Sequence, residues 1–248
     1  MSISGSTNQP FNGIEWAPGL VVRDVQPPLR LRDFKLIAFD MDSTLIDIEC
    51  VDEIADAAGR KAEVAAITEA AMRGEITDYR ESLLRRLALL KGVEVKHLEQ
   101  VYRSRLHLNP GAAELVLACK AAGLKVLLVS GGFTFFSDRL RDRLALDFAR
   151  SNKLEIVDGK LTGNLLPQSW GDICDGDMKR QTLLRVCSLL GCESSQAIAV
   201  GDGANDLEMM RVAGLSVAYR AKPKVRAQAK VAIDMGGLDR LLGVFSER

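Results

Sequence analysis

Four short apolar runs are the clearest feature of the hydrophobic pattern along this chain of 248 residues. Each is about as long as a strand that is buried on both faces, and each is followed by a turn rich in Asp, Ser or Gly. The runs are Leu36–Phe39, Val126–Val129, Ala197–Val200 and Leu215–Ala218. Stretches of helical character lie between them, among others Ala112–Ala122, Asp138–Leu144 and Lys179–Leu190. This alternation predicts an α/β fold with a doubly wound parallel sheet.

The stretch from residue 51 to residue 107 interrupts this alternation. Three amphipathic patterns follow one another there with no strand between them: Val51–Ala58, Ala62–Met72 and Tyr79–Leu90. They predict a small helical cap inserted after the first strand, where it would be well placed to act as a lid. The catalytic core would then comprise residues 34–50 and 108–248.

Two further segments have weaker patterns. Residues 1–33 contain four prolines and are expected to form an irregular extension that lies on the surface or is partly disordered, with at most one edge strand at Leu20–Val22. The stretch Leu154–Leu166 alternates around Asp158-Gly159, which predicts a β-hairpin.

Composition narrows the possible partners and the cellular compartment. Lys plus Arg and Asp plus Glu both number 33, so the chain lacks the basic excess typical of proteins that bind nucleic acids or anionic membranes. No apolar run reaches the length of a membrane span, and the N-terminus lacks a signal-like region, which favours the cytoplasm. Five cysteines without a C-x-x-C pair, together with two histidines, favour reduced thiols and argue against zinc.

Three polar loops follow the predicted strands at the edge where parallel sheets bind ligands. Asp40-Met41-Asp42-Ser43-Thr44 sets two carboxylates side by side, which need a cation or hydrogen-bond donors nearby, although an acidic helix-capping turn is the alternative. Ser130-Gly131-Gly132 has the composition of a phosphate-wrapping loop or a plain turn that opens a helix. Gly201-Asp202-Gly203-Ala204-Asn205-Asp206 offers hard oxygen ligands that suit Mg²⁺, or forms a solvated acidic turn.

A fourth element is Lys179, which is expected at the start of a helix after an acidic stretch, residues 172–177, that is interpreted as a solvated loop. A lone lysine there is usually a surface residue, but near carboxylates and a phosphate it would neutralise transition-state charge. The ordered set D-x-D-S-T, S-G-G, Lys and G-D-G-x-N-D resembles the haloacid dehalogenase superfamily, over about residues 34 to 220.

The resemblance implies a role for each of these residues. Asp40 would be the nucleophile that takes the phosphoryl group, and Asp42 the general acid and base. Ser130, Gly131 and Lys179 would bind the phosphate, while Asn205 would contact either the phosphate or Lys179. Mg²⁺ would be held by Asp40, Asp202 and the backbone carbonyl of Asp42, with Asp206 orienting the metal shell.

The predicted cap narrows the resemblance to the phosphoserine phosphatase family. The residues that carry it are the stretch from Asp40 to Gly59, Ala71-Met72-Arg73-Gly74, Ser82-Leu83-Leu84-Arg85-Arg86 and Ser130-Gly131-Gly132-Phe133. It implies that Glu49 binds the substrate ammonium, that Arg86 binds the carboxylate and that Met72 lines the pocket. Hydrolysis of O-phospho-L-serine, the last step of serine biosynthesis, is the implied activity. Without the resemblance, Glu49 and Arg86 would be interpreted as solvated helix residues.

Other functions remain open at this stage. A phosphatase or phosphotransferase acting on another small phosphorylated amino acid or alcohol would use the same core. A signalling receiver domain also becomes phosphorylated on Asp, but this chain is long for a lone receiver, and Asp42 would make the phosphorylated state short-lived. A binding protein without activity is disfavoured because all the core motifs are intact. The expected partner is a small-molecule substrate, and the expected assembly a monomer or homodimer.

Overall fold

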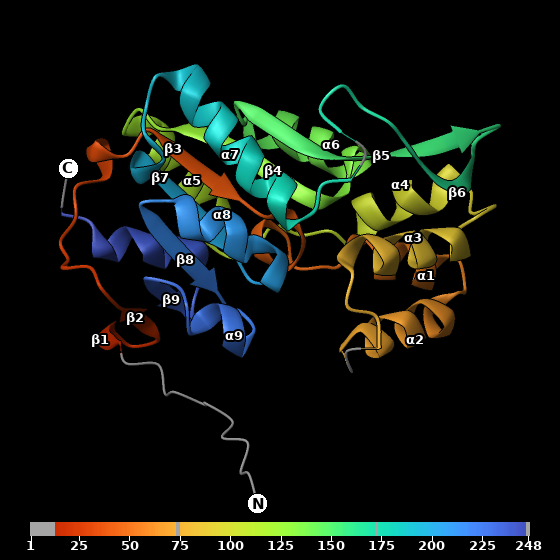
Figure 1. The fold of residues 1–248 in the computed structure, drawn as a ribbon, viewed down its shortest axis with the longest axis horizontal. Helices are drawn as coiled ribbons and strands as arrows, with labels where there is room; N and C mark the ends of the chain where they lie inside the picture. Colours follow the sequence, from red (N-terminus) through yellow and green to blue (C-terminus); the bar gives the residue numbers. More distant parts are fainter. Residues whose placement is uncertain (1–12, 73–74, 172, 247–248) are drawn as a thin grey trace, which may run out of the picture.

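A computed structural model describes residues 13–72, 75–171 and 173–246, and within them nine strands form one sheet (Figure 1). Their order across the sheet is β1-β2-β9-β8-β7-β3-β4-β5-β6. The neighbours from β9 to β5 are parallel, whereas the pairs β1–β2, β2–β9 and β5–β6 are antiparallel. The strands span Ile14–Ala17 (β1), Leu20–Val22 (β2), Leu36–Phe39 (β3), Lys125–Phe133 (β4), Phe148–Val157 (β5), Lys160–Leu166 (β6), Ala197–Gly201 (β7), Leu215–Tyr219 (β8) and Val231–Ile233 (β9). The prediction of a doubly wound α/β fold is confirmed, with a sheet that is mixed but mostly parallel.

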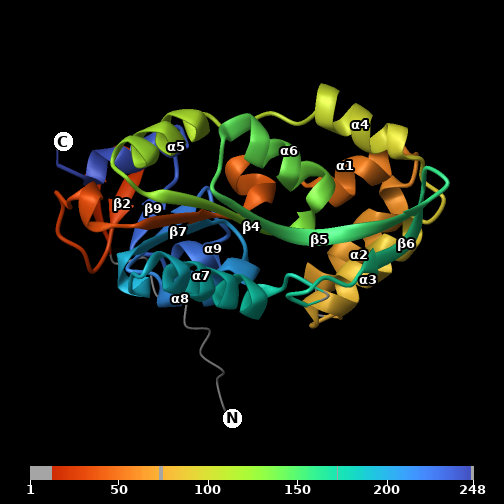
Figure 2. The same cartoon turned by 90° about the horizontal axis from the view of Figure 1, so that it is seen from above.

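Helices cover both faces of the parallel strands. Figure 2 shows α5 and α6 on one face, and α7 and α8 on the other. Side chains alternate between the two faces along a strand, so β3 contributes to both apolar layers. Ile37 and Phe39 pack in the layer under α5 and α6, and Leu36 and Ala38 pack in the layer under α7 and α8. The helices span Ala112–Ala121 (α5), Thr134–Leu144 (α6), Gly176–Leu190 (α7), Leu207–Val212 (α8) and Pro223–Arg226 (α9).

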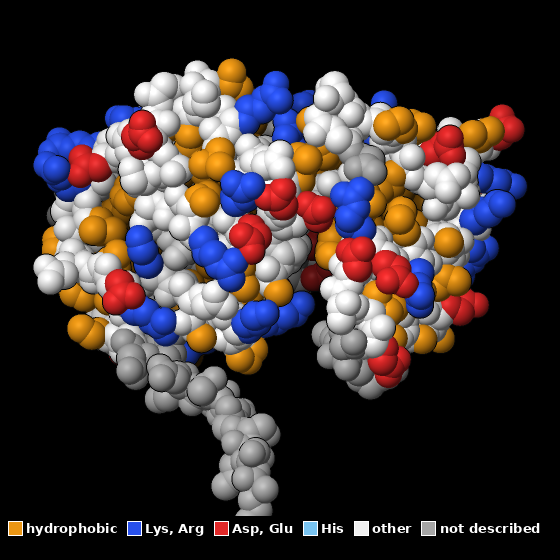
Figure 3. Space-filling view, in the orientation of Figure 1, with side chains coloured by type: hydrophobic (Ala, Val, Ile, Leu, Met, Phe, Trp, Pro, Cys, Tyr) orange, Lys and Arg blue, Asp and Glu red, His pale blue; other side chains and the backbone are white. Residues whose placement is uncertain are grey.

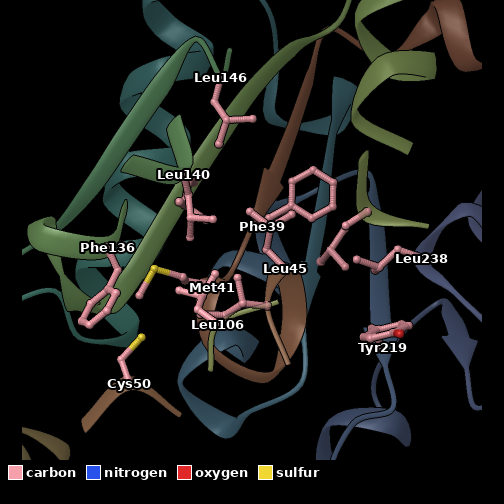
Figure 4. Packing of buried hydrophobic residues seen from close by; sticks show 14 of the residues in the cluster. Phe39, Met41, Leu45, Cys50, Leu106, Phe136, Leu140, Leu146, Tyr219 and Leu238 are labelled. Carbon is pink, nitrogen blue, oxygen red and sulfur yellow. The ribbon is translucent and has the colours of Figure 1, made fainter. Parts of the chain in front are cut away.

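The first catalytic loop is anchored from below by apolar side chains. In Figure 4 Leu45 lies beside Phe39, whereas Met41 lies toward Leu140 and Phe136. All five belong to one apolar cluster and are fully buried. Burying a side chain of this size contributes about 1.5–3 kcal/mol, so the two anchors Met41 and Leu45 hold the turn between them in place. This leaves the polar residues between the anchors free to face the opposite side.

The insertion after β3 is helical, as predicted. Its described part contains four helices rather than three: Cys50–Ala57 (α1), Lys61–Met72 (α2), Tyr79–Leu89 (α3) and Val95–Ser104 (α4). The chain leaves the core and returns to it side by side, since Ile46 and Leu108 form an antiparallel bridge. The side-chain amide of Asn109 donates to the carbonyls of Thr44 and Ile46 at 2.8 and 2.9 Å. Asn109 therefore ties this two-stranded connection to the first catalytic loop.

Two edge segments correct and complete the sequence-based description. Leu20–Val22 is a strand, but not an edge strand: it pairs with β9 on one side and with β1 on the other, so β1 is the edge. The predicted hairpin is confirmed as β5 and β6, whose turn residues Asp158 and Gly159 have φ angles of 48° and 72°.

None of the helices in the described ranges combines the length and the apolar character that a membrane span requires.

Candidate active site

A cavity of about 690 Å³ lies between the carboxyl ends of the central strands and the cap. From the core it is lined by Asp40, Asp42, Ser130, Gly131, Asp202 and Asn205, and from the cap by Glu49, Asp52, Tyr79, Ser82 and Arg86. In Figure 3 it is the cleft between the two parts of the molecule, with acidic side chains along its edges. The chain runs from β3 to β4 on one side and later to β7 on the other, so the cavity lies at the topological switch point of the sheet.

A buried lysine joins two carboxylates at the floor of the cavity. The Nζ atom of Lys179 lies 2.8 Å from Oδ1 of Asp40 and 2.7 Å from Oδ1 of Asp206. Lys179 and Asp206 are completely buried, and Asp40 is 5% exposed. Burial alone would lower the pKa of Lys179, but the carboxylates of Asp206 and Asp40 outweigh it and hold that pKa well above its ordinary value. Lys179 is therefore a permanent cation beside Asp40.

Asp206 is held with both carboxylate oxygens engaged. Oδ1 accepts a hydrogen bond from Nζ of Lys179, and Oδ2 accepts hydrogen bonds from the backbone N–H groups of Asp202 and Gly203 at 3.1 and 3.0 Å. Its side chain lies directly over Gly201, where an added Cβ would be 2.4 Å from the carboxyl carbon of Asp206. Glycine is needed at position 201 for that reason, and Asp206 is better placed to orient its neighbours than to bind a ligand itself.

The charge balance at this floor favours a bound cation. Carboxylate oxygens of Asp40, Asp202 and Asp206 all lie within 4.8 Å of one another. Within the described residues, Lys179 forms ion pairs with Asp40 and Asp206 but not with Asp202. Burial and then the charge of Asp206 raise the pKa of Asp40 well above its ordinary value, and the same two causes raise the pKa of Asp202 to about 6. Carboxylates in this state attract a hard divalent ion, so the donor set fits a metal site.

Asp42 differs from Asp40 in its surroundings. Its nearest recorded donor is the backbone N–H of Cys50, at 3.4 Å from Oδ1. Burial, and then the nearby charge of Glu49, raise the pKa of Asp42 to about 7. A carboxyl group with such a pKa can give and take a proton near neutral pH. Asp40, in contrast, forms an ion pair with Lys179.

The sequence suggested that the Ser130-Gly131-Gly132 loop opens a helix. In the structure the loop is instead a bulge inside β4. Val129 pairs with Arg150 and Phe133 with Asn152, so three residues of β4 face one residue of β5, and α6 begins only at Thr134. The hydroxyl of Ser130 accepts from the N–H of Gly132 at 2.9 Å. The first and second loops lie close together at Gly132, where an added Cβ would be 3.0 Å from Oδ2 of Asp42.

The wall opposite the catalytic floor comes from the cap. Glu49 precedes α1, is exposed and accepts a hydrogen bond from the hydroxyl of Ser43 at 2.7 Å. Arg86 on α3 is half-buried, and its Nε lies 3.4 Å from the carbonyl oxygen of Ser82. Among the described residues no carboxylate forms a direct ion pair with Arg86, although burial raises the pKa of Asp52, which lines the same cavity, and the charge of Arg86 opposes that rise. The side chain of Met72 and residues 73 and 74 lie outside the described part of the chain.

Several residues of the site were missed at the sequence level. The buried side chain of Asn152 holds the second loop in place: it donates to the carbonyl of Gly131 at 2.7 Å and accepts from the N–H of Cys174 at 2.8 Å. The hydroxyl of Thr44 donates to Asp202 at 3.1 Å. Tyr79 of the cap lies against Gly131, where a Cβ would be 1.8 Å from the tyrosine oxygen. Asn152 lies just before the predicted hairpin Leu154–Leu166 and carries no local signal, because its partners are distant in sequence.

The surroundings of Lys179 also differ from the prediction. α7 begins at Gly176, three residues before Lys179, and Asp175 caps it by accepting from the N–H of Met178 at 2.9 Å. Asp177 is exposed, as expected for a solvated acidic stretch, but it already belongs to α7. Ile173 and Cys174 are buried, so that part of the stretch is not the solvated loop that was expected. The physical reason is Asn152, which receives the N–H of Cys174 and draws this segment under the second loop.

Comparisons with known proteins agree with this geometry. Residues 34–214 match the family model of the haloacid dehalogenase-like hydrolases. Phosphoserine phosphatases from Polaromonas sp. (strain JS666) and Albidiferax ferrireducens are 72% and 69% identical, over 92% of this chain and 97% of each relative. A solved structure described as a phospho-aspartyl intermediate analogue of phosphoserine phosphatase superposes with a TM-score of 0.78 at 37% identity, over 86% of this chain and 99% of the other. This chain is a haloacid dehalogenase-like hydrolase and belongs to the phosphoserine phosphatase family.

Proposed function

We propose that this protein hydrolyses O-phospho-L-serine to L-serine and phosphate through a phospho-aspartate on Asp40. The observation that carries the proposal is the division of one cavity into two walls. The core wall has the carboxylates that phosphoryl transfer requires, with Lys179 paired to Asp40 beneath them. The cap wall has Glu49 and Arg86, which match the ammonium and carboxylate of an amino acid. The names of the 72% and 69% identical relatives support the same substrate.

In the first half-reaction, a carboxylate oxygen of Asp40 attacks phosphorus while the bond from phosphorus to the serine oxygen breaks. Asp42, with a pKa of about 7, gives its proton to that oxygen so that serine leaves as an alcohol. Splitting one displacement into two gives each step a nearby reactive group. The product of this half-reaction is an acyl phosphate on Asp40.

In the second half-reaction, water attacks the phosphorus of the acyl phosphate. Asp42 is now a carboxylate and takes a proton from this water, and the bond between phosphorus and Asp40 breaks. Phosphate leaves, Asp40 is again a carboxylate, and Asp42 again carries a proton. The residue closes its own proton cycle, so no further acid or base is required.

Charge neutralisation comes mainly from the fixed groups of the floor. Lys179 offsets the negative charge on the phosphoryl oxygens, and Ser130 together with the N–H of Gly131 is available to bind them. Asn205 lines the same cavity and would contact either the phosphate or Lys179. These donors are held in position before the substrate arrives, so the transition state requires little reorganisation.

We assign the metal site to Mg²⁺, held by Asp40, Asp202 and the backbone carbonyl of Asp42, with Asp206 orienting the surrounding groups. The cluster of three buried carboxylates, two of which are paired with Lys179, supports a divalent cation, and hard oxygen donors support Mg²⁺ in particular. When bound, Mg²⁺ screens the approach of an anionic nucleophile to an anionic phosphate.

The cap residues would select the substrate and shield the reaction. Glu49 would receive the ammonium group, Arg86 would form a two-point contact with the carboxylate, and Met72 would line the pocket. A closed cap would keep bulk water from the acyl phosphate until serine has left.

The test is phosphate release from L-phosphoserine beside phosphothreonine, phosphoethanolamine and p-nitrophenyl phosphate, each with Mg²⁺ and with excess chelator. We expect kcat/KM to be highest for phosphoserine and activity to be lost in chelator. Adding an acceptor alcohol and analysing for its phosphate ester separates hydrolysis from transfer. Equal kcat/KM across the panel would remove the phosphoserine assignment and leave the phosphatase chemistry of the core.

A further inference from the structure

A second cavity of about 310 Å³ lies between β5 and α7 and shares no lining residue with the active-site cavity. Its floor is apolar, and three arginines and one aspartate line it. The apolar residues are Leu127, Phe148, Ala149, Val186 and Leu189, and the charged ones are Arg141, Asp147, Arg150 and Arg185. Sites for small ligands commonly combine an apolar lining with a few polar groups in this way, and begin at about 300 Å³.

Two of the four charged side chains are already neutralised by neighbours. Asp147 accepts from Nζ of Lys125 at 2.7 Å and from the N–H of Val126 at 2.9 Å. Arg141 donates to the carboxylate of Asp142 at 3.0 and 3.1 Å. The cavity therefore keeps two uncompensated positive charges, those of Arg150 and Arg185, for which no carboxylate partner is recorded in the described ranges.

Arg150 is held in a fixed position with most of its donors unused. Its Nη1 donates to the hydroxyl of Thr182 at 2.8 Å, and the guanidinium lies 4.9 Å from the centre of the Trp170 ring. A guanidinium has five N–H donors, and the recorded contacts of Arg150 involve only Nη1. Burial, and to a lesser degree the charge of Arg185, lower the pKa of Arg150, so this group stands to gain from a bound anion.

We propose that the cavity between β5 and α7 is a second binding site, separate from the active site, for a small molecule that carries a phosphate group. A phosphate dianion would offset the charges of both arginines and accept from both guanidinium groups, whereas a single carboxylate would leave one charge uncompensated. The hydroxyl of Thr182 accepts a hydrogen bond from Arg150 and lines the same cavity, and the apolar lining residues would contact the carbon skeleton of a phosphate ester. Free phosphate would occupy the charged end alone.

Trp170 provides a direct reporter of occupancy, because it stacks on Arg150 and the chain has one other tryptophan, Trp16. In the full-length Trp16→Phe protein, inorganic phosphate and phenylphosphonate are titrated against matched chloride while Trp170 fluorescence is recorded. We expect a saturable change, with phenylphosphonate binding more tightly if the apolar floor contributes. Arg185→Gln should weaken binding about tenfold or more, since it removes a charge-assisted contact.

Arg143→Gln is the matched control, since Arg143 is an exposed arginine of α6 that does not line the cavity, and it should leave the titration unchanged. Calorimetry with inorganic phosphate should count two sites in the parent protein and one in Arg185→Gln. Inhibition of turnover by phosphate, which reports the active site, should be equal in both proteins. An unchanged Trp170 signal, a signal that survives Arg185→Gln, or one that follows protein concentration through self-association instead of the added anion would each overturn the proposal.

Discussion

The two walls of the active-site cavity are built on opposite principles. On the core wall the charged groups are buried and tied to one another: Lys179 bridges Asp40 and Asp206, and Asp206 also receives two backbone N–H groups. On the cap wall Glu49 is exposed, and within the described residues Arg86 forms no direct ion pair with a carboxylate. The core wall is complete without substrate, whereas the cap wall has charges that an amino acid would complement.

Under the proposed mechanism, this difference would separate the residues that perform the chemistry from those that select the substrate. Fixed charges in a dry floor stabilise a transition state without reorganising, which is where most of the rate enhancement of such enzymes is expected to arise. Loosely held charges on an inserted cap can be replaced without rebuilding the floor, because the cap is connected to the core through the two-stranded link at Ile46 and Leu108. Substitutions in the floor should therefore alter catalysis and stability together, and those in the cap mainly substrate preference.

Asp40→Asn should give the largest effect. It keeps the side-chain volume but removes the nucleophilic charge, so turnover should fall by about 10⁴-fold or more. The fold should persist, because the change also removes one of three crowded carboxylates. Phosphate release and circular dichroism together check this, and activity close to that of the unchanged protein would mean that the nucleophile is another residue.

Lys179→Met should produce the largest loss of stability. It would leave Asp40 and Asp206 buried without their cation, and removing one partner of a buried ion pair costs about 3–5 kcal/mol in the free energy of unfolding. Urea unfolding in chelator measures this value, and adding Asp40→Asn should recover part of it. Arg86→Met on the cap should cost less than about 1 kcal/mol. Equal losses from the two substitutions would break the comparison between the walls.

The metal-free floor should lose stability as the pH rises. The pKa of Asp202 is about 6 in the folded protein, above its ordinary value of 3.8, so the folded state binds this proton more tightly than the unfolded state does. That advantage is complete below about pH 4 and disappears as the pH rises through 6, a change of about 3 kcal/mol. In chelator, Asp202→Asn should therefore be more stable than the parent protein at pH 8 but not at pH 4.

Mg²⁺ supplies the second half of this test. It should raise the melting temperature of the parent protein at pH 8, where the carboxylates of the floor are ionised, and have little effect at pH 4. Asp202→Asn should lose most of the increase. A melting temperature at pH 8 that does not respond to Mg²⁺ in the parent protein would contradict the metal assignment.

Arg86→Ala tests selection by the cap. It should lower kcat/KM for phosphoserine by about 10²-fold, since a charge-assisted two-point contact contributes about 2–3 kcal/mol. It should hardly affect p-nitrophenyl phosphate, which has no carboxylate. The ratio of the two values cancels any loss of folded enzyme, and Arg86→Lys should recover only part of it.

Arg85→Ala is the matched control for this prediction. Arg85 is the preceding residue of α3, is exposed and pairs with Glu81 one turn away. It should leave both kcat/KM values unchanged. If Arg86→Ala slowed both substrates equally, Arg86 would serve the phosphate or the fold, and the argument for phosphoserine would lose its physical basis.

The parts of the fold that were predicted share one property, which is that local sequence determines them. The four buried strands are continuous apolar runs, and the hairpin has Asp158-Gly159 at its turn. The missed elements depend on distant partners. Strand β9 has three residues and is defined by its pairing with β2 and β8, and β1 exists because β2 offers it a partner.

The same distinction applies to the site. Asp40, Ser130, Lys179 and Asp202 stand in recognisable motifs, and the structure brings them to one cavity floor. The supporting contacts of Asn152, Thr44 and Tyr79 join segments as far apart as 158 positions for Thr44 and Asp202. No pattern within one segment signals such a contact. The bulge that carries Ser130 was missed for a related reason, since a bulge is defined by the neighbouring strand as much as by its own residues.

The smallest effect should come from the ion pair between Arg80 and Asp175, which joins the two walls. Arg80 of α3 reaches across the cleft to Asp175, with Nη1 3.3 Å from Oδ2, and Asp175 is also the residue that caps the helix bearing Lys179. The pair is partly exposed, at 40% and 26%, so its coupling energy should be about 0.2–1 kcal/mol. A double-mutant cycle with Arg80→Gln and Asp175→Asn measures it, because asparagine keeps an oxygen that can cap α7. If the Arg80–Asp175 ion pair helps to hold the cap over the floor, Arg80→Gln should raise KM for phosphoserine about two- to fivefold. Asp175→Asn should then add little to the KM of the Arg80→Gln protein. Arg85→Gln, on the same helix as Arg80 but paired with Glu81 within that helix, should change neither value. Additive effects of Arg80→Gln and Asp175→Asn would mean that the two walls are not coupled through this pair, and that cap position is set by the contact of Tyr79 with Gly131 instead.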